Sequence, residues 1–145
     1  PPNCNIDKKI KIDFFINTRS MMEMKLDIIK SYFKFIQEFI QEGGYFLNIN
    51  RYEKTNVGQR IRISEYPYDN KWKTVISETT KHQKRIHFLL TKRISTNEKN
   101  FFQELENIKI IGKEFYAPNF SYTYPKRIIK RILSKFGLKR VKKWK

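Results

Sequence analysis

The sequence predicts an α/β fold, and three observations indicate it. Residues 9–16 (KIKIDFFI) alternate and then run apolar, which is typical of a strand buried on both faces. Residues 24–40 carry apolar side chains at three- and four-residue steps, the period of one helix face. Residues 45–49 (YFLNI) follow as a second strand. Because the links are short, we expect a right-handed crossover with two parallel strands.

Polar residues and glycines mark the ends of the predicted helix. Residues 17–19 form a short turn after the first strand. Ser20 and Glu23 have the spacing of a capping box, in which each side chain reaches the backbone N–H of the other residue. Gly43-Gly44 is expected to end the helix, because glycine adopts the left-handed cap conformation without steric cost. The expected apolar face consists of Met24, Ile28, Tyr32, Phe35, Ile36, Phe39 and Ile40.

Further strands are expected after the second one. They cover residues 59–66 (a strand or an extended arm), 72–77 and 85–91. In the last of them, Ile86, Phe88 and Leu90 share one face. The rest of the chain predicts a helical turn over 101–105, strand character over 109–115, an aromatic loop over 118–125 and a helix over 127–136.

The positive charge is concentrated at the end of the chain. Lys and Arg number 31 against 14 Asp and Glu, a net charge of +17, and residues 126–145 hold ten of these cations and no acidic residue. This stretch also carries an apolar stripe and Trp144, as a helix lying on an anionic membrane surface does. A solvated helix packed on the domain is an equal alternative. Part of the lysine excess also fits an AT-rich genome, since Ala117 is the single alanine.

Several kinds of site are absent from the sequence. The five glycines form no G-x-G, which excludes a Walker loop and a dinucleotide fingerprint. Two histidines and one distant cysteine make a poor ligand set, so we expect no metal. A lone cysteine excludes a disulfide scaffold, and no apolar run is long enough to span a bilayer, so a cytoplasmic location is expected. The chain does not begin with Met, and we expect it to be part of a longer protein.

Polar side chains gather where the two parallel strands end. The first strand is followed by Asn17, Thr18, Arg19, Ser20 and Glu23, and the second ends in Asn48, Asn50, Arg51 and Tyr52. Ligands of open α/β sheets bind outside the carboxyl ends of strands, so both sets are expected to line one crevice. For Asn17 and Ser20, turn formation and capping are the simpler explanation, and Asn50 and Arg51 fit either role. Arg19 has no evident structural role and could hold a carboxylate or phosphate.

Taken together, these segments resemble a known family. The order IDFFIN, TRSMMEM, Gly-Gly, YFLNINR and RIHFLLTKR resembles the C-terminal half of a class I S-adenosylmethionine-dependent methyltransferase. The segments NTRSMMEM, FLNINRYEKT, SEYPYDNKW and residues 83–90 resemble the sugar O-methyltransferases of bacterial surface-polysaccharide gene clusters. The resemblance covers residues 8–93. It implies half of a Rossmann-like sheet, in which a strand, a helix and a strand precede an antiparallel hairpin of the last two strands.

The resemblance implies S-adenosylmethionine as cofactor and a sugar or lipid-linked glycan as substrate. The family's Gly-rich loop and acidic residue, which grip the cofactor, would lie upstream of Pro1. Residues 1–93 would therefore be the C-terminal half of the methyltransferase domain, inactive on its own. Residues 94–125 would be an aromatic and polar extension, and residues 126–145 a basic amphipathic tail that contacts the inner face of the cell membrane.

The resemblance also assigns roles to particular residues. Asn17 and Thr18 would lie against the cofactor. Substrate contacts would come from Arg19, Asn50, Arg51, Tyr66, Tyr68 and Trp72. The three aromatic side chains would pack on the sugar ring, with ordinary core or loop packing as the alternative. Three residues are candidates for the base that takes the hydroxyl proton, namely His82, His87 and Glu23. His82 is favoured because it follows a polar turn, and the base could also lie in the missing half.

Two other functions stay open at this point. A basic nucleic-acid-binding module is compatible with the charge and the aromatic content. The aromatic residues are not interleaved with cations on one strand face, as RNA-stacking platforms require, and nucleic acid is the less favoured partner. A glycosyltransferase fragment from the same kind of gene cluster is the other alternative, although the sequence contains no D-x-D metal motif.

Overall fold

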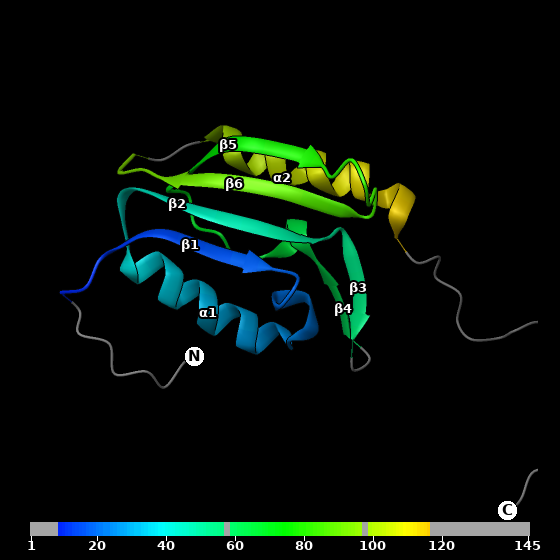
Figure 1. The fold of residues 1–145 in the computed structure, drawn as a ribbon, viewed down its shortest axis with the longest axis horizontal. Coiled ribbons are helices and arrows are strands. Elements are labelled where there is room, and N and C mark those ends of the chain that lie inside the picture. The colour runs from blue at the N-terminus through cyan, green and yellow to red at the C-terminus, as the bar shows by residue number, and fades with distance from the viewer. Residues whose placement is uncertain (1–8, 57–58, 97–98, 117–145) are drawn as a thin grey trace, which may run out of the picture.

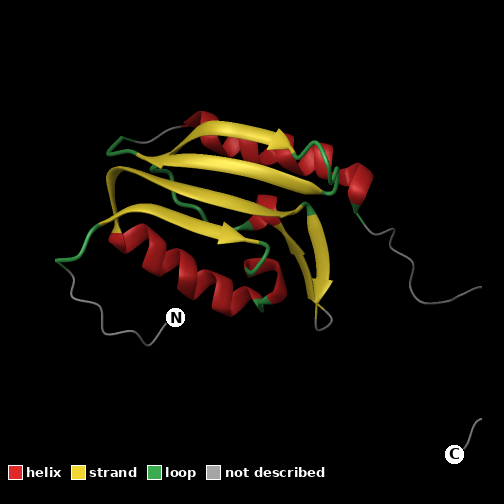
Figure 2. Cartoon of the chain, viewed as in Figure 1, coloured by secondary structure: helices red, strands yellow, loops and turns green. Residues whose placement is uncertain are grey.

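The computed structural model describes residues 9–56, 59–96 and 99–116, which form a mixed α/β fold around a four-stranded sheet (Figure 1). The sheet has the order β1-β2-β6-β5. Its strands are β1 (Ile12–Thr18), β2 (Ile40–Arg51), β5 (Trp72–Thr79) and β6 (Ile86–Arg93). The helices are α1 (Leu26–Phe39) and α2 (Lys99–Gly112), and a separate hairpin consists of β3 (Glu53–Asn56) and β4 (Gln59–Arg62) (Figure 2). Three 3-10 turns complete the described part: η1 (Met21–Glu23), η2 (Ile63–Glu65) and η3 (Lys113–Phe115).

The predicted strand-helix-strand unit is confirmed. β1 and β2 are parallel, with Phe15 opposite Phe46 and Asn17 opposite Asn48, and α1 connects them. β6 is antiparallel to both of its neighbours, β2 and β5. β5 therefore runs in the same direction as β1 and β2, so three strands end at the same edge of the sheet.

The predicted role of Gly43-Gly44 as a helix stop is wrong. α1 ends at Phe39, and β2 begins at the next residue and runs through both glycines. Gly43 has a φ of +85°. A Cβ on Gly44 would lie 3.0 Å from the carbonyl oxygen of Asp13, which belongs to the neighbouring strand β1. The two glycines thus serve an irregularity in the parallel pairing near Ile12, where the register shifts.

The capping box predicted at Ser20 and Glu23 is also wrong. Ser20 makes no side-chain cap bond to η1, and its hydroxyl donates instead to the Asn17 side-chain oxygen. The Glu23 carboxylate forms an ion pair with Lys54 of β3. The long helix begins only at Leu26, with Lys25 in the cap position. These polar side chains therefore fasten the turn to neighbouring strands rather than cap the helix.

The buried face of α1 is partly different from the predicted one. Ile29, Phe33, Ile36 and Phe39 are buried, whereas Ile28 is 37% exposed. The sequence carries apolar residues at both members of several adjacent pairs, such as Ile28-Ile29 and Tyr32-Phe33. Periodicity alone therefore could not select the face that contacts the sheet.

The segment after β6 is helical over most of its described length. The helical turn expected over 101–105 belongs to α2, and the strand expected over 109–115 is wrong, because those residues form the end of α2 and η3. Phe101, Leu105 and Ile108 are buried in the same core as the sheet residues. The described part of the 94–125 extension is thus integral to this fold. The loop expected over 118–125 and the helix expected over 127–136 lie outside the described residues.

One hydrophobic core covers a single face of the sheet. On α1, Phe33 contacts Phe46 of β2, with ring centroids 5.8 Å apart. Tyr68, in the segment between η2 and β5, contacts Phe33 on one side and Phe101 of α2 on the other, at 4.7 and 5.0 Å. The loop that precedes β5 therefore fills the space between the two helices.

The opposite face of the sheet carries apolar side chains that no described helix buries. Phe14, Ile16 and Ile76 are 47, 57 and 41% exposed. Between them lie half-buried side chains of the central strands, namely Tyr45, Leu47, Ile49, Phe88 and Leu90. The buried residues of α1 and α2 belong to the core on the first face. A contiguous apolar surface of this kind favours association.

We expect this apolar face to bind a hydrophobic dye and to cause self-association of the chain. Replacing both Ile16 and Ile76 with Lys should reduce dye fluorescence and shift sedimentation toward the monomer. The free energy of unfolding should change little, by about 1 kcal/mol, because both side chains are already exposed. The matched control is Ile110→Lys on α2, which is 59% exposed on another surface. Equal behaviour of the control and the double variant would contradict the expectation.

Candidate functional site at the carboxyl edge of the sheet

The carboxyl edge of the sheet brings together three segments that are far apart in the sequence. β1 and β2 end at Thr18 and Arg51, and the turn over residues 80–85 follows β5 at the same edge. The backbone N–H of Arg19 donates to the carbonyl of Ile49 at 2.8 Å, and the N–H of Tyr52 donates to the carbonyl of Arg85 at 3.1 Å. The two predicted sets of polar residues therefore share one edge, where Thr18, Arg19 and Arg51 are exposed, but the two surface hollows at this edge are lined by Arg51 and by none of residues 17–23.

Arg19, at this edge, has an unusual backbone conformation. Its φ is +57°, in the left-handed region. For an L-residue with a side chain, this conformation costs roughly 1–2 kcal/mol. The Arg19 side chain is exposed and makes no ion pair with another described residue. Backbone strain of this kind concentrates at functional sites, and here it holds a guanidinium group at the carboxyl edge.

Asn17 has a structural role in the described fold. It is 3% exposed, and its amide donates to the side-chain oxygen of Asn48 at 2.9 Å. Its own oxygen accepts from the Ser20 hydroxyl and from the backbone N–H of Met21 at 3.3 Å. Asn17 thus fixes the turn between β1 and η1, and the contact with a cofactor implied by the resemblance is not available to its buried side chain.

Asn50 is likewise buried, at 0% exposure. Its amide donates to Asn48, and the Asn48 amide donates to the Tyr68 hydroxyl at 3.1 Å. The side-chain oxygen of Asn50 has no hydrogen-bond partner among the described residues. Asn50 therefore belongs to a ladder of buried amides beneath the edge, while its neighbour Arg51 projects to the surface.

The three aromatic residues assigned to the sugar ring lie in the core. Tyr66, Tyr68 and Trp72 are 4, 7 and 0% exposed. The rings of Tyr66 and Phe33 are 5.6 Å apart, and those of Trp72 and Phe46 are 6.0 Å apart. Burial raises the pKa of Tyr66 and of Tyr68, which keeps both phenols neutral. Core packing, the alternative considered from the sequence, is the arrangement found.

Of the three candidate bases, His87 is buried and fully hydrogen-bonded. It is 1% exposed, and its Nδ1 and Nε2 lie 2.9 Å from the hydroxyl oxygens of Tyr52 and Ser77. The Ser77 hydroxyl donates to Glu104, so it accepts the Nε2 proton of a neutral His87. Burial lowers the pKa of His87 to about 4. His87 therefore offers no free nitrogen to a substrate.

The other two candidate bases are at the surface. His82 is exposed in the turn between β5 and β6, which is held by the bond from the Thr80 hydroxyl to the carbonyl of Gln83 at 2.8 Å. Glu23 lies in η1 and is paired with Lys54. Both lie near the carboxyl edge, and His82 is the one of the two that forms no ion pair with another described residue.

Sequence reasoning missed part of the lining of this edge. Two adjoining surface hollows, of about 480 and 570 Å³, share Arg51, Arg85 and Phe115. Lys84 lines the first hollow. Phe115 stacks on Tyr52 with ring centroids 5.3 Å apart. The signal available in the sequence was the Lys84-Arg85 pair directly before the last strand, which a hairpin of the last two strands places beside the end of the second one.

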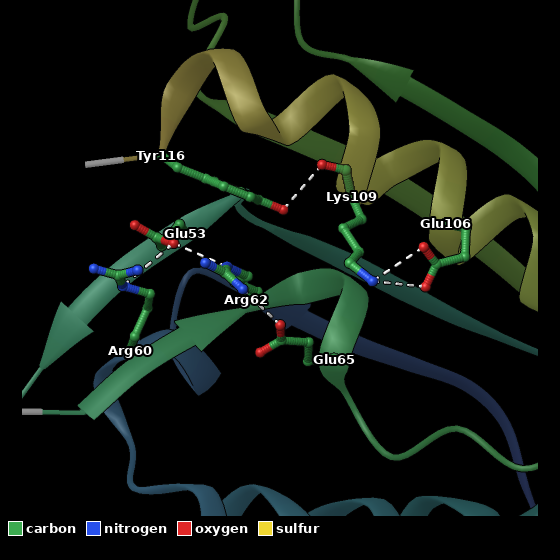
Figure 3. A network of polar contacts seen from close by, with 7 residues as sticks. All are labelled: Glu53, Arg60, Arg62, Glu65, Glu106, Lys109 and Tyr116. Carbon is green, nitrogen blue, oxygen red and sulfur yellow. Dashed lines mark hydrogen bonds and ion pairs between the residues drawn. The ribbon is translucent and has the colours of Figure 1, made fainter. Parts of the chain in front are cut away.

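A network of charged residues links the β3–β4 hairpin to the end of the chain segment that follows β6, as Figure 3 shows, and two of its members, Glu53 and Tyr116, line the second hollow. The Glu53 carboxylate, whose side chain is 1% exposed, lies 2.9 Å from Arg62 and 3.6 Å from Arg60. Arg62 also lies 4.4 Å from the ring centre of Tyr116, and the Tyr116 hydroxyl donates to the carbonyl of Lys109 at 3.1 Å. The network joins the hairpin to the residue that follows η3, and its arginine side chains are already paired with the Glu53 carboxylate.

No known protein family, curated protein or solved structure matches this chain. Two further findings concern the part of the chain that the structure describes. No three His, Cys, Asp or Glu side chains gather there as a metal site. Neither of its helices is long and apolar enough to cross a membrane.

Proposed function

We propose that this chain is the C-terminal half of a Rossmann-like, S-adenosylmethionine-dependent sugar O-methyltransferase of surface-polysaccharide biosynthesis. The observation that carries the proposal is the order of elements around one edge. A parallel β1-α1-β2 unit precedes an antiparallel β5–β6 hairpin, as the resemblance implies, and exposed Arg19 and Arg51 lie where the parallel strands end. A mixed sheet with such an edge is a common site for a small-molecule ligand.

The donor groups at the edge fit one end of the cofactor. The amino-acid part of S-adenosylmethionine carries a carboxylate, and a guanidinium group binds a carboxylate with two parallel hydrogen bonds. Arg19 and the Thr18 hydroxyl are exposed side by side in the chain and would hold this group. When bound, the cofactor supplies a methyl group on a positively charged sulfur. Arg19 is equally suited to an acidic group of the substrate.

The proton of the accepting hydroxyl must go to a base. His82 is proposed for this role, because it is exposed at the carboxyl edge in a turn that ends next to Arg51. Arg51 is proposed to orient the sugar or lipid-linked glycan. We also propose that residues 126–145, which lie outside the described residues, bring the enzyme to the cytoplasmic face of an anionic membrane.

The direct test uses the full-length gene product. Its coding sequence upstream of the Pro1 codon should encode a strand followed by a Gly-rich loop. The product should transfer an isotope-labelled methyl group from S-adenosylmethionine to a sugar or lipid-linked glycan. Transfer of a glycosyl group from a nucleotide sugar, or tight oligonucleotide binding without methyl transfer, would contradict the proposal.

Arg19→Gly gives a sharper prediction for the same product. Glycine tolerates the φ of +57°, so this change removes the guanidinium while keeping the turn. We expect the KM for either S-adenosylmethionine or the sugar to rise roughly tenfold or more, the worth of one charge-assisted hydrogen bond. The co-substrate whose KM rises identifies the partner of Arg19. Lys25→Gly, at another exposed cation near α1, is the control, and an unchanged KM for both co-substrates in Arg19→Gly would exclude the assigned role.

A further inference from the structure

The first of the two hollows is strongly positive. It lies between the end of β2, the turn before β6 and η3, and its lining residues are Arg51, Gln83, Lys84, Arg85, Ile86 and Phe115. Three of these six are cations and none is acidic. Acidic residues enter only in the adjoining hollow, where Glu53 and Glu114 contribute to the wall. The positive charge is therefore gathered in a hollow of a size that small-molecule ligands occupy.

The three cations in this hollow have no ion-pair partner among the described residues. The side chains of Arg51, Lys84 and Arg85 are exposed, and none of them forms an ion pair or hydrogen bond with another side chain of the described chain. Neighbouring cations differ in this respect. Arg60 and Arg62 share the Glu53 carboxylate, and Lys54 is paired with Glu23. Like charges held together without counterions favour an anionic ligand.

The backbone that carries these cations is fixed. In the pairing of β2 with β6, Arg51 lies opposite Ile86. The N–H of Tyr52 donates to the carbonyl of Arg85, and the N–H of Ile86 closes the turn on Gln83 at 2.8 Å. The side chains of Arg51 and Arg85 are therefore attached to neighbouring backbone positions. Because the sheet fixes these positions, little backbone entropy is lost when they bind a ligand.

We propose that Arg51, Lys84 and Arg85 form a subsite for the diphosphate group of an activated sugar. This inference rests on the proposed function and names the substrate class of the same edge. Two guanidinium groups each match two phosphate oxygens, and Lys84 adds a point charge. A neutral sugar would need none of these cations. The stacked ring of Phe115 gives the hollow an apolar wall beside the anion.

The arrangement favours a small diphosphate over a nucleic-acid backbone. A nucleic-acid groove continues its cations along a track that follows successive phosphates. Here the cations of the adjoining β3–β4 hairpin, Arg60, Arg62 and Lys54, are occupied by carboxylates. A diphosphate ester has two natural sources, a nucleotide sugar and a lipid-linked sugar, and both present the same anionic group to the hollow.

The test measures binding to the full-length product by titration calorimetry at low and moderate salt. The probes are inorganic pyrophosphate, uridine 5′-diphosphate, geranyl diphosphate and a short oligothymidylate. The variant is Arg51→Gln with Arg85→Gln. The control is Lys30→Gln with Lys34→Gln, which removes two exposed cations from α1 and leaves the same net charge. Lys84→Gln alone serves as a milder second variant.

We expect pyrophosphate to bind, and its affinity to fall roughly 10- to 100-fold in the double arginine variant but not in the control. Lys84→Gln should produce a smaller loss. Tighter binding of uridine diphosphate identifies a nucleotide sugar as the source, and tighter binding of geranyl diphosphate identifies a lipid-linked one. Absence of pyrophosphate binding, an equal loss in the control, or tighter oligothymidylate binding with the same arginine dependence would overturn the subsite.

The methyl-transfer assay separates this inference from the proposed function. Methyl transfer to a sugar that carries no phosphate, unaffected by the double arginine change, would overturn the subsite and leave the methyltransferase. Arginine-dependent pyrophosphate binding without methyl transfer would leave the subsite and overturn the methyltransferase.

Discussion

Trp72→Ala is expected to lower the free energy of unfolding by about 3–5 kcal/mol, the range for loss of a large buried aromatic side chain. Trp72 is 0% exposed and packs against Phe46 and Tyr68, with ring centroids 6.0 and 5.8 Å away. Its Nε1–H donates to the Gln37 side chain at 3.2 Å. The substitution therefore leaves a cavity and an amide oxygen that loses one of its donors. Urea denaturation followed by circular dichroism measures the effect.

Two further variants show what kind of residue Trp72 is. Phe102→Ala on α2 removes an aromatic ring that is 44% exposed and should cost far less. Trp72→Phe keeps most of the packing and should lie between the two. If Trp72 instead packed on a sugar ring, Trp72→Ala would leave the unfolding free energy near that of the parent chain and would change only ligand affinity.

The backbone arrangement was largely accessible from the sequence because it depends on local patterns. Alternation and apolar runs located β1, β2, β5 and β6 within a few residues, and the three- and four-residue period located α1. The parallel pairing followed from the helix predicted between the two strands, because a strand-helix-strand unit crosses over to a parallel strand by default. The end of α1 was misplaced because Gly43 and Gly44 accept unusual conformations in a strand as well as in a helix cap.

The site was less accessible, because it depends on which face of the sheet is covered. Alternation placed Ile86, Phe88 and Leu90 together but could not show that the core lies on the other face, with His87 and Leu89. Tertiary packing alone decides this, and it buried His87, along with Asn17 and Asn50, inside the fold.

The surface cations were predictable only in part for the same reason. Arg51 follows directly from the end of a parallel strand, as Arg19 does. Arg85 joins them only through the antiparallel pairing of β6 with β2, where Tyr52 and Arg85, 33 positions apart in the chain, are hydrogen-bonded. The Lys84-Arg85 pair is visible in the sequence, but no local signal shows that β6 pairs with β2, so the hollow emerges only from the three-dimensional arrangement.

The buried His87 gives the second large prediction, an acid-dependent loss of stability. Burial lowers the His87 pKa from 6.5 to about 4 in the folded chain. Between these values the unfolded chain binds a proton that the folded chain does not, so the free energy of unfolding falls as the pH falls from 6.5 to 4. The total loss from this residue is about 3 kcal/mol, at 1.36 kcal/mol per unit of pKa difference. Above pH 6.5 the contribution is complete.

His87→Gln isolates this effect, and His82→Gln is its matched control. Glutamine can keep a hydrogen bond to Tyr52 or Ser77 but does not titrate, so the variant should be less stable than the parent at neutral pH, with a much shallower loss between pH 6.5 and 4. His82 is exposed in the turn, outside the hydrogen bonds of His87, and its replacement controls for the loss of a histidine as such. Asp69 contributes a further loss of stability in acid. Burial raises its pKa, but hydrogen bonds and positive charges, those of Arg93 first, together lower it by more. Both variants keep Asp69 and Arg93, so this contribution is the same in all three chains. Urea denaturation at half-unit steps of pH measures the free energy of unfolding of all three chains.

Parallel curves for the parent and His87→Gln would contradict the prediction. They would show that the folded chain admits a charged imidazole, and that the chain of hydrogen bonds from Glu104 through Ser77 to His87 opens in solution.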